Sequence, residues 1–318
     1  MTQHRGPMSP VKIRFQTVPY SMESAAQGMS GRRPAGEPLR RCATVLVAAL
    51  CASAGYAASQ GAAPAVQPPA WELVWADEFA GDKLDDAKWS RCQRGKADWQ
   101  NTMSDDPRLL KIENGVLHLL GIANDSKDKD PSPYLTAGLT SRGKFAFTYG
   151  RVEIRARFKS AQGAWPALWM LGAEGGWPGG GEIDLMEHLN FDDKVYQTVH
   201  SEYTHSIDKT GTPKQGGTAK ISRDDWNTYG CEWNEDKIVF LVNGEPAHVY
   251  PRVPEKGEKQ WPFKQPFFFI LSMQIGGGWV NRSGPTNPEH YPAGMEVDWV
   301  RVCQAKKPAG RPDAGGGK

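Results

Sequence analysis

Three acidic residues, Glu182, Asp184 and Glu187, lie close together in the segment GGGEIDLMEHLN. In an extended strand the side chains alternate between the two faces, so Glu182 and Asp184 share one face and Glu187 would point to the other. A β-bulge, which adds one residue at Leu185 or Met186, returns Glu187 to the face of the other two acids. A helix would give no shared acidic face, because Glu182 would lie about 140° around the axis from Glu187. We therefore predict a bulged strand that presents three carboxyl groups.

Three carboxyl groups in this arrangement could cleave a glycosidic bond. Like charges a few ångströms apart resist ionising together, so at least one pKa rises and that group can hold a proton near neutral pH. A retaining glycosidase needs such a division: one carboxylate attacks the anomeric carbon and the other protonates the leaving sugar, with the two groups roughly 5 to 5.5 Å apart. The alternative is a solvated acidic strand, because three acids at this loose spacing are common.

The rest of the chain predicts an all-β fold that would position these acids. Runs of alternating apolar and polar residues recur between turn residues, and 35 glycines with 24 prolines leave little room for long helices. The clearest runs are VLHLLGI, RVEIRARF, YQTVHSEY, IVFLVNG and MEVDWVRVC, and the clearest turns are Glu113-Asn114-Gly115 and Asn243-Gly244. This pattern is typical of two antiparallel sheets packed as a sandwich. The twelve tryptophans could fill its core or stack on sugars in a groove.

The beginning of the chain differs from the rest. Arginines precede an apolar run from Cys42 to about Leu50, and small residues follow up to Ala57, which is the order of a signal peptide. A transmembrane helix would need roughly 20 apolar residues, which is longer than this run. A lipoprotein anchor at Cys51 is a further alternative. We predict a secreted or periplasmic protein whose mature chain starts near Ala58.

The chain is expected to contain a single folded domain. Segments rich in Ala, Pro, Gln and Gly flank it and cannot build a core. We predict four parts: residues 1–57 as an upstream segment and signal peptide, 58–70 as a flexible leader, 71–305 as the domain, and 306–318 as a disordered tail.

Charge and cysteine content exclude several classes of function. The net charge is +2, and Lys and Arg are scattered among Asp and Glu, so nucleic acid is not an expected partner. We expect a monomer without membrane contact after signal cleavage. The predicted domain holds Cys92, Cys231 and Cys303, so at most one disulfide can form. Because Cys231 and Cys303 lie in apolar strand-like runs, buried free thiols are favoured over a nucleophile or a metal site.

Several motifs in one order resemble glycoside hydrolase family 16. They are WADEF, YGRVEIRARF, GAWPALWML, GEIDLME, YGCEW and MEVDWVRV, and the resemblance covers nearly all of residues 71–304. It implies a concanavalin/lectin-like β-jelly-roll sandwich with an open concave cleft, which cuts internal β-linkages with retention. By this resemblance Glu182 is the nucleophile, Asp184 the assisting acid and Glu187 the acid/base. The two residues between Asp184 and Glu187 are similar to the laminarinase-like branch, although Cys231 and Cys303 stand where other residues are commoner.

The resemblance also implies residues that contact the sugar. The candidates are Trp165, Trp169, His200, Gln274 and Trp279. For the first two, a place in the core is an equal alternative, whereas His188 is expected on the face opposite Glu187. The spacing of His188, His200 and His205 does not match the usual zinc patterns.

Many relatives in the resembled family carry a structural calcium on the convex side. The matching positions are Glu78, the backbone near Gly115, and Asp298, and oxygen ligands of this kind suit calcium. Alternatively, Asp298 only hydrogen-bonds its neighbours. No cofactor is expected to be required for catalysis.

The expected partner is a polysaccharide or oligosaccharide substrate. The laminarinase-like spacing favours a β-1,3- or mixed β-1,3/1,4-glucan. GEIDLMEHLN, YQTVHSEYTH and LSMQIGGGW also resemble relatives that cut β-galactosyl linkages in galactan or mucin-type glycans. A non-catalytic carbohydrate-binding jelly roll is a third possibility, but the intact trio of acids argues against it.

Overall fold

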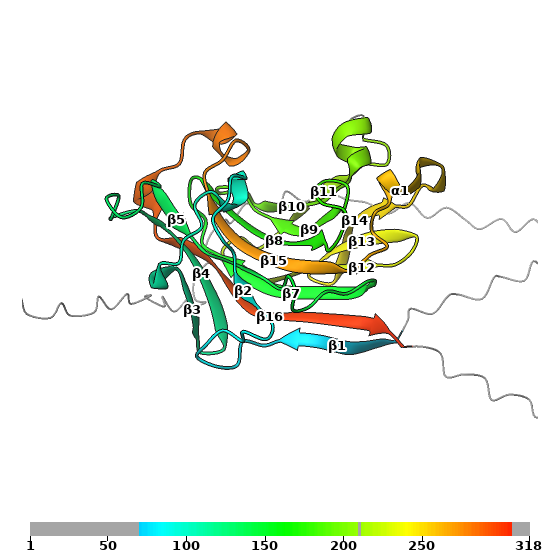
Figure 1. The fold of residues 1–318 in the computed structure, drawn as a ribbon, viewed down its shortest axis with the longest axis horizontal. Coiled ribbons are helices and arrows are strands. Elements are labelled where there is room, and N and C mark those ends of the chain that lie inside the picture. The colour runs from blue at the N-terminus through cyan, green and yellow to red at the C-terminus, as the bar shows by residue number, and fades with distance from the viewer. Residues whose placement is uncertain (1–69, 209–210, 307–318) are drawn as a thin grey trace, which may run out of the picture. The chain divides into compact units, whose positions relative to one another are not determined.

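The computed structural model describes residues 70–208 and 211–306, whose strands form two antiparallel sheets packed as a sandwich (Figure 1). The first sheet has the order β14 (Glu245–Pro251), β13 (Lys237–Val242), β12 (Asn227–Trp233), β7 (Gly150–Phe158), β16 (Ala293–Ala305), β4 (Val116–Ala123) and β3 (Leu110–Glu113), with β1 (Trp71–Asp77) on β16 and β5 (Tyr134–Thr136) on β4. The second sheet has the order β11 (Gly216–Lys220), β10 (Lys194–His200), β9 (Glu182–Glu187), β8 (Ala164–Gly172), β15 (Phe267–Ile275), β6 (Gly138–Thr140) and β2 (Ser90–Arg91). The predicted all-β sandwich is confirmed.

Helices contribute only short turns to the described residues. They are η1 (Asp98–Gln100), η2 (Pro107–Leu109), η3 (Tyr203–Ile207), η4 (Pro254–Lys256), α1 (Gly257–Gln260), η5 (Val280–Ser283) and η6 (Pro288–His290). None of these has the length and apolar character needed to cross a bilayer. The predicted signal peptide lies outside the described residues, as do the leader and tail apart from Ala70 and Lys306.

The predicted strands and turns agree with the structure, with one exception. Both turns place consecutive residues at positive φ, 55° and 74° at Asn114-Gly115 and 52° and 82° at Asn243-Gly244, which suits two-residue hairpins. The run YQTVHSEY was predicted as one strand, but β10 ends at His200. There Ser201 and Thr204 exchange hydrogen bonds: each backbone N–H donates to the other's hydroxyl oxygen, at 2.9 and 3.2 Å. These local bonds compete with the sheet ladder and start η3.

The core lies between the two sheets and follows the two-residue period of the strands. In β7 the buried positions alternate with half-buried ones, and Val152, Ile154, Ala156 and Phe158 all face the core. β15 departs from this pattern, because all nine of its residues are buried. Its second face is covered by a segment that includes Met103. This cover lies on the face of the second sheet that carries the acids.

The register of β9 contains the predicted bulge. Asp184 pairs with Trp169 and Thr198 on the neighbouring strands, whereas Glu187 pairs with Ala167 and Tyr196. From Asp184 to Glu187 the chain advances three residues along β9, whereas the paired residues on β8 and on β10 are only two apart. Both Leu185 and Met186 are fully buried in the core, which leaves Glu187 on the side of Glu182 and Asp184.

Gln197 stabilises this bulge from the next strand. Its side chain is completely buried, and Nε2 donates to the carbonyl oxygen of Leu185 at 2.9 Å and to that of Leu241 at 3.2 Å. A bulge interrupts the ladder, and a buried carbonyl without a partner is costly. We infer that Gln197 supplies the hydrogen bond that the bulge removes from Leu185.

The cysteines of the described residues are free thiols. Cys92 and Cys231 are buried, as expected for Cys231, whereas Cys303 is only partly buried. Cys303 was predicted to be buried, but it follows Val302 on β16, and alternation turns it away from the core.

Gln197→Leu should lower the free energy of unfolding by about 1 to 3 kcal/mol, because it leaves the Leu185 carbonyl unsatisfied. It should also lower kcat of the hydrolase activity expected from the sequence, since the bulge positions Glu187. Gln260→Leu is the matched control: Gln260 is equally buried and bonds the backbone of Pro251 and Val253.

The control should lose stability without a comparable loss of kcat. Urea unfolding and initial rates measured on both variants separate the two effects. Equal kcat values in the two variants would show that Gln197 does not position the acids.

Candidate active site

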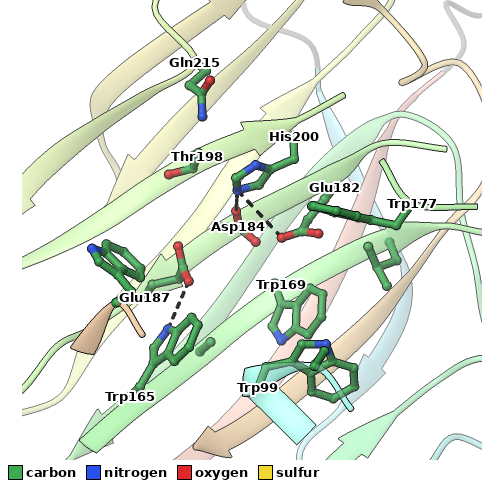
Figure 2. A pocket seen from close by; sticks show the side chains of 14 residues that line it. Trp99, Trp165, Trp169, Trp177, Glu182, Asp184, Glu187, Thr198, His200 and Gln215 are labelled. Atoms are coloured by element: carbon green, nitrogen blue, oxygen red, sulfur yellow. Dashed lines mark hydrogen bonds and ion pairs between the residues drawn. The ribbon is translucent and has the colours of Figure 1, made fainter. Parts of the chain in front are cut away.

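A cavity of about 610 Å³ lies on the face of the second sheet that carries the three acids (Figure 2). Its walls are mainly aromatic and apolar, with a few polar groups. It is lined by Ala97, Trp99, Trp165, Ala167, Trp169, Leu171, Trp177, Glu182, Asp184, Glu187, Thr198, His200, Gln215 and Trp279. A largely apolar cavity with a few convergent polar groups is the usual form of a ligand site.

The three predicted acids meet in this cavity. Glu182, Asp184 and Glu187 all come from β9 and point to the same side, as the bulge requires (Figure 2). The side chain of Glu182 is 16% exposed and that of Asp184 only 3%. Asp184 is therefore more deeply buried than Glu182, and it lies between the two glutamates, which also line the cavity.

Trp165 orients Glu187. Its indole Nε1 donates to Glu187 Oε1 at 3.0 Å. The ring of Trp165 is held in turn by Trp279, which meets it edge-on at 5.6 Å between centroids, and Tyr196 packs against Trp279 at 5.1 Å. One carboxyl oxygen of Glu187 is thus anchored by an aromatic cluster.

His200 lies beside the other two acids. It pairs with Glu182 across the β9–β10 ladder. Its Nε2 lies 3.4 Å from Asp184 Oδ2 and 3.9 Å from Glu182 Oε1. His200 lines the cavity, and its contact with sugar stays a prediction.

Burial and mutual repulsion raise the pKa values of all three acids. Burial is the largest cause for each. It raises the pKa of Glu182 to about 8, with a further contribution from Asp184, while His200 and a hydrogen bond from Trp177 act in the opposite direction. The pKa of Asp184 is raised well above its ordinary value by burial and by Glu187. Burial and Glu182 raise the pKa of Glu187 to about 7, against His200 and Trp165. The trio can therefore hold protons near neutral pH.

Both tryptophans of β8 line the cavity, the position that the family resemblance implied for them. Trp165, Ala167, Trp169 and Leu171 occupy alternate positions of the strand, and all four face the cavity. Trp169 also belongs to a buried cluster: it is 5% exposed, and its Nε1 donates to Ser272 Oγ at 3.2 Å. Trp279 lines the cavity as predicted.

The structure does not place Gln274 at the cavity, so it gives no support to the predicted sugar contact. Gln274 is 1% exposed and does not line the cavity. Thr102 Oγ1 donates to its Oε1 at 3.0 Å, and its Nε2 donates to the Ile275 carbonyl at 2.8 Å. The side chain is on the expected side of β15, but the segment after η1 covers it.

Four polar or aromatic residues of the cavity were not predicted: Trp99, Trp177, Thr198 and Gln215. Thr198 could have been found, because it precedes His200 by two residues on the same strand. Trp177 has 54% of its surface exposed and packs against His205 at 4.7 Å. Trp177 and Gln215 come from loops and Trp99 from the short helix η1, so no strand periodicity indicated these three residues.

His188 lies on the opposite face from Glu187, as predicted. It is fully buried, packs on Phe158 at 4.3 Å between ring centroids, and its Nε2 bonds the Asp192 carbonyl at 2.8 Å. This histidine belongs to the core.

The residues expected to hold calcium have other partners. Glu78 accepts two hydrogen bonds from Arg301, at 2.7 and 2.8 Å, and Asp298 is paired with Arg155. Gly115 lies in the turn between β3 and β4. Calcium needs six to eight oxygen ligands, and two carboxylates already neutralised by arginine do not fit that requirement. The structural calcium stays a prediction that this arrangement does not favour.

Comparison with known proteins gives one consistent family. The model of glycosyl hydrolases family 16 matches residues 97–301. The keratan-sulfate endo-1,4-beta-galactosidase of Sphingobacterium multivorum is 38% identical over 237 residues, which cover 73% of this chain but only 55% of that protein. The chain thus spans about half the length of this relative. The beta-glucanase of Rhodothermus marinus is also 38% identical, over 250 residues that cover 74% of this chain and 85% of that protein.

Solved structures agree with the sequence comparison. The laminarinase of Rhodothermus marinus has a TM-score of 0.68 at 35% identity and covers 76% of this chain and all of its own. SCLam, a non-specific endo-beta-1,3(4)-glucanase, has a TM-score of 0.67 at 28% identity, with 75% and 93% covered. A mutant of SCLam presents 1,3-beta-D-cellobiosyl-glucose at its active site. Since the family model matches residues 97–301 and the fold agrees, the chain belongs to glycoside hydrolase family 16.

Proposed function

We propose that this enzyme is a secreted, retaining endo-β-glycosidase that hydrolyses internal linkages of a β-1,3- or mixed β-1,3/1,4-glucan. The observation that carries the proposal is the bulge in β9, which brings two glutamates to one face of an aromatic-lined cavity. A double displacement needs two carboxyl groups that reach the same glycosidic bond in different protonation states.

Glu182 acts as the nucleophile in this proposal. Its neighbour Asp184 is more deeply buried and has its pKa raised well above the ordinary range, so Asp184 retains a proton. A protonated Asp184 no longer repels Glu182 and can donate a hydrogen bond to it. Protonation of Asp184 removes the contribution of its charge to the raised pKa of Glu182. In this proposal Glu182 is therefore the group that ionises in the complex, and it attacks the anomeric carbon to form a glycosyl-enzyme.

Glu187 acts as the acid and then as the base. One of its oxygens accepts the indole N–H of Trp165, so the other can carry the proton that is given to the leaving sugar. A pKa raised to about 7 suits a group that must both donate and accept a proton near neutral pH. In the second step, ionised Glu187 removes a proton from the water that releases the sugar from Glu182, and two inversions give net retention.

Five of the twelve tryptophans line the cavity and suit a glycan chain. Their faces can stack on the C–H surfaces of pyranose rings, while their N–H groups reach hydroxyls. The glucan proposal is supported by the beta-glucanase relative and by the structures of laminarinases.

An endo-β-galactosidase is the second candidate. It is favoured by the Sphingobacterium relative, which is as identical to this chain as the beta-glucanase is. A non-catalytic binding module, the third reading of the sequence, agrees less well with three carboxyl groups held together in the cavity.

A panel of polysaccharides tests the substrate. We expect reducing ends to be released from laminarin and mixed-linkage β-glucan, with oligosaccharides rather than monosaccharide as the early products, because an endo-enzyme cuts internal bonds. Keratan sulfate and β-galactan are the comparison substrates. Faster release from either of these would replace the glucan proposal by the galactosidase one, and early monosaccharide alone would contradict the endo mode.

The roles of the two glutamates can be separated with an aryl glycoside, whose leaving group departs without protonation. Glu182→Ala should be nearly inactive, because the attack itself is lost. Glu187→Ala should accumulate a glycosyl-enzyme on Glu182, and azide should release it as a β-glycosyl azide, since azide needs no general base. Asp184→Asn should be intermediate. Product configuration by NMR is the readout.

The opposite result would exchange the assignments of the glutamates. Rescue of Glu182→Ala to an α-glycosyl azide, with Glu187→Ala left dead, would make Glu187 the nucleophile.

Because the pKa of Glu187 is raised in the folded protein, the free energy of unfolding should fall as the pH rises. Between the ordinary pKa near 4.5 and about 7, the folded protein binds a proton that the unfolded chain has released, so stability falls as the pH rises. Glu187→Gln removes this titration and keeps an acceptor for Trp165. Its free energy of unfolding should exceed that of the parent protein by an amount that grows from pH 5 to pH 8 and reaches the order of 1 to 3 kcal/mol, measured by urea unfolding and seen also as a higher melting temperature.

The control is Glu245→Gln at the exposed start of β14, which should change the melting temperature little at any pH. A stability gain in Glu187→Gln that shrinks from pH 5 to pH 8 would contradict the raised pKa.

A further inference from the structure

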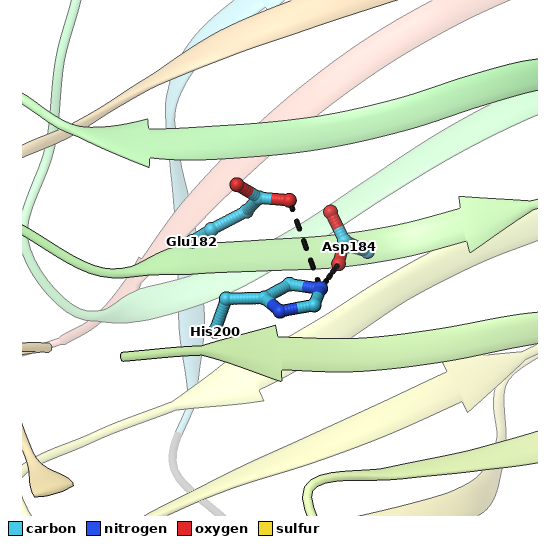
Figure 3. A group of neighbouring side chains, drawn as sticks. All are labelled: Glu182, Asp184 and His200. Carbon is cyan, nitrogen blue, oxygen red and sulfur yellow. Dashed lines mark ion pairs between the residues drawn. The ribbon is translucent and has the colours of Figure 1, made fainter. Parts of the chain in front are cut away.

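Glu182, Asp184 and His200 bring three metal-ligating atoms together (Figure 3). Glu182 Oε1, Asp184 Oδ2 and His200 Nε2 all lie within 4.8 Å of one another. The two acids come from β9 and the histidine from β10, so two paired strands of one sheet hold the group. Among residues 70–208 and 211–306, no other group of histidine, cysteine and acidic side chains comes together in this way.

Asp184 Oδ2 is the independent sign that this group can take a ligand. Asp184 is 2% exposed, and within the described residues this oxygen accepts no hydrogen bond. Buried polar atoms nearly always have a partner, and an exception calls for an ion, a water or a functional explanation. The atom faces the ring nitrogen of His200 at 3.4 Å.

The spacing of the atoms fits a small tetrahedral metal centre. Bonds of 2.0–2.2 Å from zinc to nitrogen and carboxylate oxygen place neighbouring ligands about 3.4 Å apart. His200 Nε2 lies 3.4 Å from one oxygen and 3.9 Å from the other, so small side-chain movements would close the site. All three residues line the cavity, which leaves the fourth position open to water.

The donor set selects the class of metal. One imidazole and two carboxylates suit zinc and neighbouring transition metals. Calcium and magnesium prefer six or more oxygen ligands, which three side chains do not supply. A divalent ion would displace the proton of Asp184 and offset the charges of the two buried carboxylates that bind it.

We propose that Glu182, Asp184 and His200 form a reversible site for a zinc-like divalent transition metal ion, and that the bound ion inhibits the glycosidase. The lone pair of Glu182 that would attack the sugar is then donated to the metal. The ion also occupies the cavity where the sugar must lie, so metal and substrate exclude each other. Binding does not depend on the proposed substrate, whereas inhibition rests on the proposed role of Glu182.

Binding can be measured without any substrate. Calorimetric titration of the metal-free full chain with Zn²⁺ should give one site per chain, and Co²⁺ should give the strong visible absorption of a tetrahedral centre. His200→Ala and Asp184→Asn should each weaken Zn²⁺ binding at least tenfold. His205→Ala is the matched control, since His205 packs on Trp177 at the cavity but is not a ligand.

The control should bind Zn²⁺ like the parent protein, and circular dichroism verifies that every variant is folded. Unchanged Zn²⁺ affinity in folded His200→Ala, or the absence of any one-to-one binding in the parent protein, would overturn the site.

Inhibition is measured separately, on whichever β-glycan the enzyme cleaves. Zn²⁺ should raise the apparent KM without changing kcat, EDTA should restore the rate, and Mg²⁺ should have no effect. Binding of Zn²⁺ at this site with full activity retained would overturn the inhibitory role. If the glucans prove to be the wrong substrates, the calorimetric and cobalt results still decide the site.

Discussion

The active site depends on one extra residue in β9. Side chains of a regular strand alternate strictly, so Glu182 and Asp184 could not share a face with Glu187 without the bulge. The bulge turns both Leu185 and Met186 into the core, where each is fully buried. The same distortion leaves a carbonyl that the ladder does not satisfy, and the buried amide of Gln197 bonds it. The grouping of the three acids and the packing of Leu185 and Met186 are thus consequences of the same local irregularity.

The second constraint is electrostatic. Three carboxyl groups in a largely apolar cavity all have raised pKa values, because burial disfavours their charges and each charge opposes the others. The neighbours act selectively: Trp165 bonds Glu187, while His200 lies beside Asp184 and Glu182. Because three ionised carboxylates would repel one another here, the site favours states in which some of the three groups keep a proton. By the same reasoning it would favour the divalent cation that we propose for this site.

The cavity is built from strands and loops in different ways. β8, β9 and β10 supply the floor, where alternate residues face the sugar-sized space (Figure 2). The walls carry Trp99, Trp177 and Trp279, which lie outside the strands. Rigid strands hold the reacting groups, and loops on the same scaffold can vary the glycan that fits. The strands that carry the acids identify the family. The walls outside the strands would set the substrate, so glucan and galactan remain separate candidates.

The sequence by itself determined the strands, the two tight turns, the bulge and the three acids, because each depends on residues within a few positions of one another. The family resemblance pointed to Trp165, Trp169 and His200 and left a core position open for the two tryptophans, and the structure places all three at the cavity. Only the tertiary structure decided the rest. Gln274 lies on the face of β15 that carries the cavity, but Asn101 and Thr102, which are far away in sequence, cover it. Trp177 and Gln215 reach the cavity from loops without periodicity. The histidine spacing indicated no zinc pattern, yet β-sheet pairing sets His200 against two acids of the neighbouring strand. Contacts between distant segments arise from packing, and no local pattern encodes them.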